Sequence, residues 1–317
     1  MKDAYLSQQL EAYLTVRAAL GFQTHATGLL LCDFLRYLEA RQLSSPLRAQ
    51  VAIDWVCDSA VPHQASTQVQ RLSIVRGFLA FLRASQPETE LPDHRLLARP
   101  KRPTPYLFTA EQITQLLSAV ARMKPAHSLR PHAWRLLLGL LVSTGLRVGE
   151  ACRLEIGDLH LTPAPPYLHI RETKFRKSRL VPLHTSAVAE LNAYLEKRQA
   201  LGYAALSDTL LLTEWGKPFQ PVTLWRTFKR LTQRLGMRPP AGDRPPSLHS
   251  LRHTFAVNRL CAWYREGRPV QELVPQLSVY LGHMRPQESY WYLTATPELL
   301  GAASTRFAQF ADPGGAL

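Results

Sequence analysis

The sequence predicts a mainly α-helical protein with one small β-sheet, an α+β fold in which a helical first domain precedes a mixed, mostly helical second domain. Three observations lead to this prediction. Four amphipathic segments with helical spacing fill the first hundred residues, where no strand-like alternation occurs. A proline-rich stretch follows them. Beyond it, two short apolar segments flank a basic turn, and helical spacing returns after them.

Length and charge set the first bounds on function. At 317 residues the chain is long enough for two domains, each with its own core. It has 38 Lys and Arg against 24 Asp and Glu, a formal net charge of +14. Residues 1–100 hold 10 basic and 9 acidic side chains, so residues 101–317 hold 28 and 15. This excess favours a polyanionic partner for the second domain, although a merely basic surface also fits.

The cysteines and the hydropathy pattern exclude other classes. The four cysteines lack any C-x-x-C pair, so we expect neither a zinc site nor a disulfide framework, and a reducing cytoplasm fits best. They are Cys32, Cys57, Cys152 and Cys261. No run of 18 apolar residues and no N-terminal apolar signal region occur, so we expect neither secretion nor a membrane span.

The first domain is expected to be a bundle of four helices. The segments are residues 4–20, 24–39, 45–60 and 64–84, and glycine or proline separates them. The fourth segment carries Arg71 and Arg76, which are candidate phosphate contacts, although such a charge row is also typical of a solvated helix face.

A connector follows the predicted bundle. Residues 86–106 hold five prolines, which remove backbone donors and resist helix formation. The stretch also has a basic tip formed by Arg99, Lys101 and Arg102. We therefore place a domain boundary here, with a linker over residues 89–105. The basic tip fits a segment lying along a phosphate backbone and equally fits a solvated spacer.

The second domain begins with two helices and a sharp turn. A capping box at Thr109 opens a helix to about residue 121, and a strongly apolar helix spans about residues 131–143. Gly145 then allows a turn into Arg147, which lies beside a helix junction. Glu150 stands three residues later, where it can hold the guanidinium in position.

The β region and a basic helix come next. Strands are expected at residues 167–171 and 179–183, either as a hairpin or as the last two strands of a small sheet. The turn between them carries Lys174, Arg176 and Lys177. A helix over about residues 186–199 follows. Another helix, at residues 222–235, presents basic side chains near one face and is suited to a DNA groove. These are Arg226, Lys229 and Arg230.

Two residues with phosphoryl-transfer chemistry occupy the start of the next helix. Ser247 is its expected N-cap, and His249 and Arg252 lie three residues apart on one face. A planar guanidinium binds two phosphate oxygens at once, and an imidazole carries a proton to or from a third. The pair therefore predicts a site for a phosphate diester.

Two more such residues follow that helix. A helix over residues 270–281 is expected to end at Gly282, so His283 stands at a helix C-terminus, where the dipole favours its protonated form. Tyr292 comes nine residues after His283. A tyrosine that arrives last in such a cleft is placed as a nucleophile.

Taken in order, these motifs resemble the tyrosine recombinase (integrase) family, which includes the Xer, Cre and phage-integrase proteins. They are T-G-L-R-x-x-E from Thr144, a hairpin lysine, H-x-L-R-H from His249, L-G-H, and a tyrosine nine residues later. No single motif decides the matter; their order and spacing do. The resemblance covers nearly the whole chain. It implies a core-DNA-binding domain at residues 1–88 and a catalytic domain at residues 106–317.

The resemblance also implies a role for each matching residue. Arg147 and Arg252 clamp the non-bridging oxygens of the scissile phosphate, and His283 donates a hydrogen bond to it. His249 acts in acid–base transfer. The remaining roles are protonation of the leaving 5′-oxygen by Lys174, attack by Tyr292 to form a 3′-phosphotyrosyl link, and support from Glu150. Because that link conserves the phosphodiester energy, the resemblance implies no metal ion and no cofactor.

Some assignments stay open in the sequence. Lys174 is counted back from the RLVPL strand, with Lys177 as the alternative. His253 is interpreted as a structural histidine, because it stands one helical step from the inward face. Tyr290 and Trp291 precede the nucleophile, and we expect at least one of them in the core, with Tyr290 filling it beside Trp291. The aromatic segment here resembles recombinases carried by mobile elements.

The resemblance implies double-stranded DNA with specific recombination sites as substrate, and a homo-oligomer with a dimer on each site and a tetramer in the synapse. We expect an apolar helix over residues 297–310 to dock on a neighbouring protomer. Two rival functions remain: an accessory DNA-binding protein with decayed catalysis, and a nicking and resealing enzyme like a type IB topoisomerase. The target sequence, the direction of recombination and any helper protein stay open.

Overall fold

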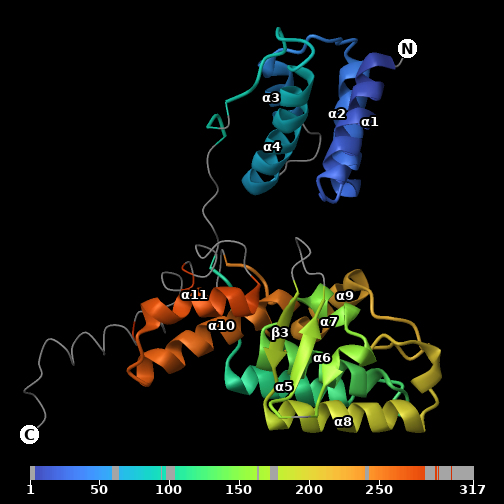
Figure 1. Cartoon of the computed structure of the whole chain (residues 1–317), viewed down its shortest axis with the longest axis vertical. Coiled ribbons are helices and arrows are strands. Elements are labelled where there is room, and N and C mark those ends of the chain that lie inside the picture. The colour runs from blue at the N-terminus through green and yellow to red at the C-terminus, as the bar shows by residue number, and fades with distance from the viewer. Residues whose placement is uncertain are drawn as a thin grey trace, which may run out of the picture. The chain divides into compact units, whose positions relative to one another are not determined.

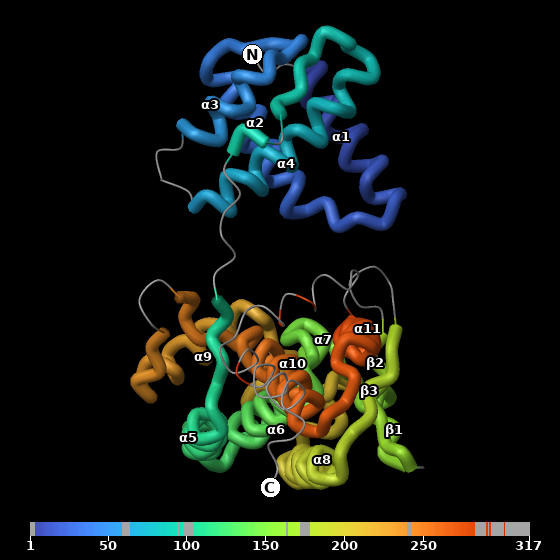
Figure 2. Tube along the Cα trace, turned by 90° about the vertical axis from the view of Figure 1, so that its left-hand side faces the viewer, coloured from blue at the N-terminus to red at the C-terminus, as the bar shows by residue number. Residues whose placement is uncertain are grey.

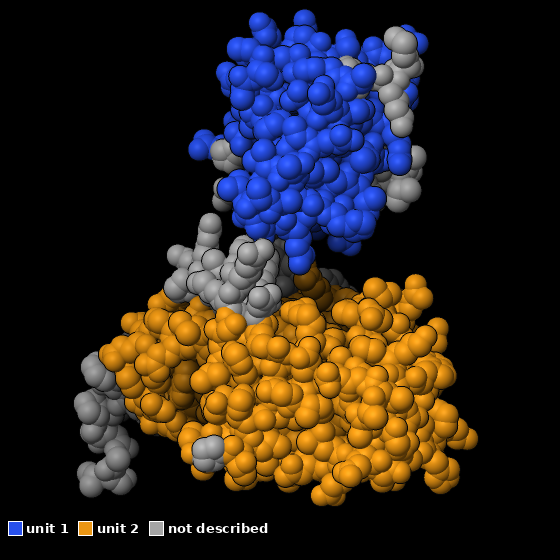
Figure 3. All heavy atoms as spheres, turned by 45° about the vertical axis from the view of Figure 1, so that its right-hand side comes forward, with its two compact units in different colours: residues 1–102 blue, residues 103–317 orange. Residues whose placement is uncertain are grey.

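The computed structural model divides the chain into two compact units, Met1–Arg102 and Pro103–Leu317 (Figures 1 and 3). The structure describes residues 4–58, 64–93, 95–97, 104–162, 164–171, 178–239, 243–282, 290, 292 and 301. Each unit has a hydrophobic core of its own. The division falls inside the proline-rich stretch at residues 86–106.

In its described residues, unit 1 (the Met1–Arg102 unit) contains four helices, as the periodicity predicts. They are α1 (Ala4–Ala19), α2 (His25–Ala40), α3 (Ala49–Cys57) and α4 (Ala65–Leu82). Their apolar faces meet in one core, where Phe34 and Trp55 pack edge to face at 5.2 Å between ring centroids. Helix α3 begins four residues later than expected, because the backbone is still extended at Arg48, its N-cap.

Unit 2, the Pro103–Leu317 unit, is mostly helical. Its α-helices are α5 (Ala110–Ala121), α6 (Arg130–Thr144), α7 (Val148–Arg153), α8 (Thr185–Ala200), α9 (Pro221–Arg234), α10 (Leu248–Arg265) and α11 (Val270–Leu281). Short 3₁₀ helices are η1 (Ile156–Asp158) and η2 (Ala204–Leu206). Helix α6 contacts α5, α8 and α10 and is buried on most sides, as its apolar sequence predicts.

A three-stranded antiparallel sheet completes unit 2. The strands β1 (Leu159–His160), β2 (Tyr167–Ile170) and β3 (Arg179–Pro182) follow one another in the order β1-β2-β3. The expected strands are therefore the last two of the sheet, and β1 was not predicted because two residues show no periodicity. Leu168 faces Val181 across the ladder, and both are buried. Strand β3 lies beside α11 (Figure 2).

The residues expected to form the site lie at the ends of helices in unit 2. Helices α10 and α11 lie side by side (Figure 1). They pack together around Leu260 and Val274, and Tyr292 belongs to the same core. Ser247 caps α10 by accepting from the backbone N–H of Ser250, as expected. Within the described part of the chain, none of the helices combines the length and the apolar character that crossing a membrane requires.

Candidate active site

Arg147 lies at the turn that links α6 to α7. The turn is possible because Gly145 has φ 63°, a left-handed conformation that glycine adopts without strain. Arg147 is the N-cap of α7, and its guanidinium donates to Glu150 Oε1 at 2.8 Å. The same guanidinium donates to the carbonyl oxygen of Gly282 at 2.7 Å. Arg147 is thereby fixed both by its own helix and by the end of α11.

Arg252, on α10, binds next to Arg147 at the end of α11. It is 1% exposed and donates to the carbonyl oxygens of Gly145 at 2.7 Å and Leu281 at 2.5 Å. Because Leu281 and Gly282 are consecutive, the Arg252 and Arg147 guanidinium groups bind successive carbonyls and lie close together. Burial, and secondarily the charge of Arg147, lowers the pKa of Arg252 to about 10, so the side chain is still protonated at neutral pH.

Glu150 neutralises part of this charge. It is 4% exposed and receives a second guanidinium, that of Arg179 at the start of β3, at 3.1 Å to Oε1 and 2.7 Å to Oε2. Burial alone would raise the pKa of Glu150, but the hydrogen bonds and charge of Arg179, together with the bonds from Arg147, lower it to about 2. The carboxylate is therefore ionised at any physiological pH.

Gly282 permits the close approach of these arginines. Its φ is 66°, and a Cβ at this position would lie 2.9 Å from Nη1 of Arg179 and 3.3 Å from Nη1 of Arg147. We call Arg147, Arg179, Arg252 and Glu150 the arginine cluster. Three guanidinium groups against one carboxylate leave an excess of two positive charges at a helix junction. Such a site is suited to an anion with several oxygens.

A tyrosine and two histidines adjoin the cluster. The Tyr292 hydroxyl lies 2.8 Å from Nδ1 of His253, and the side chain is 2% exposed. His253 in turn meets His249 edge to face, with ring centroids 4.5 Å apart. Tyr292 is also near enough to Arg252 that a negative charge on its phenol oxygen would stabilise the protonated guanidinium. The described site thus combines two arginines on adjacent carbonyls, two imidazoles and a buried phenol.

The family model for phage integrases matches residues 107–298, which include all of these side chains. The chain belongs to the phage integrase family. A putative integrase/recombinase of Sinorhizobium fredii (strain NBRC 101917 / NGR234), y4rB, is 38% identical over 304 residues, which cover 94% of this chain and 96% of that protein. The predicted family is confirmed, and the chain is a tyrosine recombinase.

Solved structures of integrase-family proteins have the same fold. The XerH site-specific recombinase bound to palindromic difH substrate, in a post-cleavage complex, has a TM-score of 0.68 at 19% identity, covering 95% of this chain and 84% of that one. A λ integrase tetramer bound to a Holliday junction has a TM-score of 0.63 at 19% identity, covering 90% and 76%. The predicted fold class, mainly helical with a small sheet, is confirmed.

The structure brings four of the six expected catalytic residues of this integrase-family chain into one site. Arg147 and Arg252 share the arginine cluster, and His249 and Tyr292 both contact His253. The remaining two expected residues, Lys174 and His283, lie outside the described residues. The same holds for Arg99, Lys101, Arg102, Arg176, Lys177 and Trp291, and for the helix expected at residues 297–310 except Gly301.

The two tyrosines near the C-terminus differ from expectation. Tyr290 was expected to fill the core, but it is 40% exposed, whereas Tyr292 is buried at 2%. The expectation for Tyr290 is therefore wrong. Tyr292 fills the core position between α10 and α11, because its ring packs against their apolar side chains while its hydroxyl reaches His253.

The described basic side chains expected to bind DNA fall into two groups. In unit 1, Arg71 pairs with Asp33 at 3.2 Å and lies over the Trp55 ring at 3.8 Å, and Arg76 donates to a backbone carbonyl at 3.0 Å. These contacts are structural. The basic residues of α9 are exposed, and the Lys229 ammonium lies 5.3 Å from the ring centroid of Trp225, which is itself 54% exposed.

Sequence reasoning missed Arg179 and gave His253 only a structural role. The available signal for Arg179 is its position as the first residue of the partly buried strand β3, because a charged side chain there needs a partner. For His253, its i+4 spacing from His249 on one helix was the available signal. The tertiary contact with Tyr292 spans 39 residues and carries no local signature.

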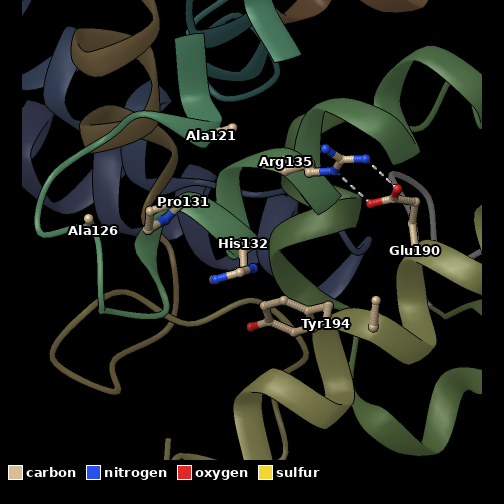
Figure 4. Close-up of a pocket in the computed structure, with 8 residues that line it drawn as sticks. Ala121, Ala126, Pro131, His132, Arg135, Glu190 and Tyr194 are labelled. Atoms are coloured by element: carbon tan, nitrogen blue, oxygen red, sulfur yellow. Dashed lines mark hydrogen bonds and ion pairs between the residues drawn. The ribbon is translucent and has the colours of Figure 1, made fainter. Parts of the chain in front are cut away.

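A hollow of unit 2 lies between α5, α6 and α8, and none of the arginine cluster lines it (Figure 4). Across it, Arg135 and Glu190 form a bidentate pair at 2.9 and 2.6 Å, so their charges are already matched. Burial lowers the pKa of His132 in its wall, and Lys197 and Arg135 lower it further. Among the described residues, no group of His, Cys, Asp and Glu is arranged to hold a metal ion.

Proposed function

We propose that this integrase-family chain is a site-specific recombinase that cuts and rejoins duplex DNA with Tyr292 as nucleophile. One observation carries the proposal. The guanidinium groups of Arg147 and Arg252 bind the successive carbonyls of Gly282 and Leu281, beside the buried Tyr292 hydroxyl. A phosphate diester at this point receives several charge-assisted donors while a phenol oxygen stands ready to attack.

In the proposed reaction the Tyr292 oxygen attacks the phosphorus, and the bond from phosphorus to the 5′-oxygen breaks. Arg147 and Arg252 neutralise the charge that develops on the non-bridging oxygens, the largest catalytic contribution in such sites. His249 serves acid–base transfer and His283 donates to the phosphate. Lys174 protonates the leaving 5′-oxygen, and Lys177 is its alternative. The second transesterification, by a 5′-hydroxyl of the partner strand, releases Tyr292.

The arginine cluster gives this mechanism a rigid base. Glu150 holds the Arg147 guanidinium and is itself held by Arg179, so the Arg147 side chain loses little freedom when a phosphate binds. Arg179 Nε is buried and has no hydrogen-bond partner among the residues that the structure describes. An oxyanion near this nitrogen would satisfy it.

The substrate and the assembly follow from the charge pattern and the relatives. Double-stranded DNA fits the basic second unit, and the exposed Arg226, Lys229 and Arg230 of α9 are proposed as its phosphate and groove contacts. Because XerH is bound to a palindromic substrate and λ integrase forms a tetramer on a Holliday junction, a dimer on each site and a tetramer in the synapse are proposed here. The cytoplasm is the proposed location, because its reducing conditions keep the four free cysteines as thiols.

A two-site assay tests the proposed function. Duplexes that bind the Tyr292→Phe protein are first selected from a random pool, and two copies are then placed in one plasmid. Wild-type protein is expected to invert or excise the segment between them. Relaxation of the plasmid without strand exchange would instead indicate a nicking and resealing enzyme, and binding without any covalent complex would indicate an accessory protein.

A further inference from the structure

His253 contacts the hydroxyl oxygen of Tyr292, the atom that is proposed to attack the phosphorus, and has no role in the proposed reaction so far. Its Nδ1 lies 2.8 Å from the Tyr292 hydroxyl, within the range of a normal hydrogen bond. The two ring centroids are 5.5 Å apart and the ring planes are tilted by 59°, so the rings do not stack and the contact is made through the polar atoms. A packing role alone would not require this alignment.

The first turns of α10 explain why the contact is made by His253. Arg252 points to the carbonyls of Gly145 and Leu281, and the next residue on the helix is turned by about 100° from it. His249 and His253 stand four residues apart, and their rings meet edge to face with centroids 4.5 Å apart at 83°. The helix thus directs Arg252 toward the end of α11 and His253 toward the tyrosine, with His249 beside His253.

The surroundings of Tyr292 favour removal of its proton. A negative charge on the phenol oxygen interacts favourably with the buried Arg252. The ordinary pKa values are about 10 for tyrosine and about 6.5 for histidine, so a phenol gives up its proton less readily than an imidazolium does. Because the phenol is the weaker acid, the transfer has to accompany attack on phosphorus.

We propose that His253 is the general base that takes the proton of Tyr292 during DNA cleavage; this assignment rests on the proposed function. As the Tyr292 O–H bond breaks, the proton passes to Nδ1 of His253 and the oxygen forms its bond to phosphorus. The phosphorus–5′-oxygen bond breaks, and the leaving oxygen receives a proton from the general acid. In the reverse step His253 returns its proton to Tyr292. His249 keeps its proposed role in acid–base transfer at the phosphate.

The test is the single-turnover rate of covalent complex formation on a selected duplex. His253→Ala is expected to slow this rate by about 100-fold or more while DNA affinity stays unchanged, because a positioned base contributes about 100- to 10,000-fold. Added imidazole is expected to restore part of the rate by occupying the vacated space. His253→Asn keeps a hydrogen-bonding group near Nδ1 without basicity, and it is expected to remain slow.

A matched control uses the other described His–Tyr pair of unit 2. His160 stacks on Tyr167 between β1 and β2, with centroids 4.5 Å apart, and His160→Ala is expected to form the covalent complex at the wild-type rate. Thermal unfolding checks that each variant is folded. If His253→Ala fails to fold, His253→Asn decides, since a slow rate with unchanged DNA affinity supports the assignment.

A wild-type rate in His253→Ala, or a full rate in His253→Asn, would overturn the assignment. Failure of the wild-type protein itself to form a covalent complex would count against the proposed function instead. The two failures are therefore distinguishable in one experiment.

Discussion

Glu150 shows how single residues build this site. A buried carboxylate is costly unless it is paired, and here it receives two guanidinium groups that would otherwise repel each other. The same contacts orient Arg147 toward the end of α11. Removal of the carboxylate leaves buried cations uncompensated, which is more damaging than loss of one surface ion pair.

Glu150 also predicts a pH dependence of stability. Its pKa is lowered from 4.5 to about 2 in the folded protein, so its stabilisation is complete above pH 4.5 and is lost as the pH falls toward 2. We expect the free-energy difference between wild type and Glu150→Gln to shrink by up to about 2 kcal/mol between pH 5 and pH 3. Urea unfolding across this range measures it. A difference that does not change with pH would contradict the ionised pair.

Gly282 gives a second prediction at a single position. In Gly282→Ala the added Cβ meets two guanidinium groups, so we expect covalent complex formation to fall by about 100-fold through misplacement of Arg147. The control is Gly267→Ala, where φ is 68° and nothing lies within 4 Å of the added Cβ. Both variants are expected to lose about 1 kcal/mol of stability from the left-handed backbone. Equal cleavage rates in the two variants would contradict the close approach.

The sequence predicts most of this site because its residues follow helix junctions. Gly145 and Gly282 mark the two turns, and Arg147 and Arg252 each stand at a fixed distance from a cap. Arg179 escapes such reasoning because its partner, Glu150, lies 29 residues away on another element. The burial of Tyr292 and the exposure of Tyr290 depend on how the last segment packs, which local periodicity cannot show.

At the scale of elements, α9 combines an exposed basic face with a buried apolar one. Its buried side contains Leu224 and Phe228, so the helix is fixed in the core while its charged residues point outward. The helix bounds agree closely with those expected from the sequence, as they do for α6. Strand β1 has only two residues and no such pattern, and pairing with β2 alone defines it.

Substitutions on α9 test its contact with DNA. Arg226→Ala and Lys229→Ala are each expected to weaken DNA binding and to lower the slope of log affinity against log salt by about 0.9 for each phosphate that is no longer neutralised. The control is Lys197→Ala on α8, which lies along the edge of unit 2 away from α9 (Figure 1). Salt titrations by fluorescence anisotropy provide the measurement. Unchanged slopes on α9, or an equal change on α8, would exclude α9 as the DNA-binding helix.

The whole molecule consists of two units with separate cores and unequal charge. Unit 1 holds 12 basic and 9 acidic side chains and unit 2 holds 26 and 15, so we expect unit 2 to contribute most of the electrostatic attraction to DNA. The boundary lies within the proline-rich stretch because proline disfavours both helix and sheet there. A connector of this composition is the expected place for protease cleavage.

Limited proteolysis tests this organisation. Trypsin is expected to cut the free protein first among Arg99, Lys101 and Arg102, and a selected duplex is expected to slow that cut if the basic linker follows the DNA. Mass spectrometry of early fragments identifies the site. First cleavage within residues 110–290, or a linker cut whose rate DNA leaves unchanged, would contradict this organisation.

The most direct measurement maps the residue that is covalently bound to DNA. Wild-type protein is incubated with a selected duplex and digested with nuclease and protease, and the peptide that carries the nucleotide remnant is sequenced by mass spectrometry. Tyr292 is expected to carry the remnant, because its hydroxyl lies against His253 and near Arg252. Tyr292→Phe is expected to bind DNA normally and form no covalent complex, whereas Tyr290→Phe retains it. A remnant on Tyr290, the exposed neighbour, would contradict the proposed active site.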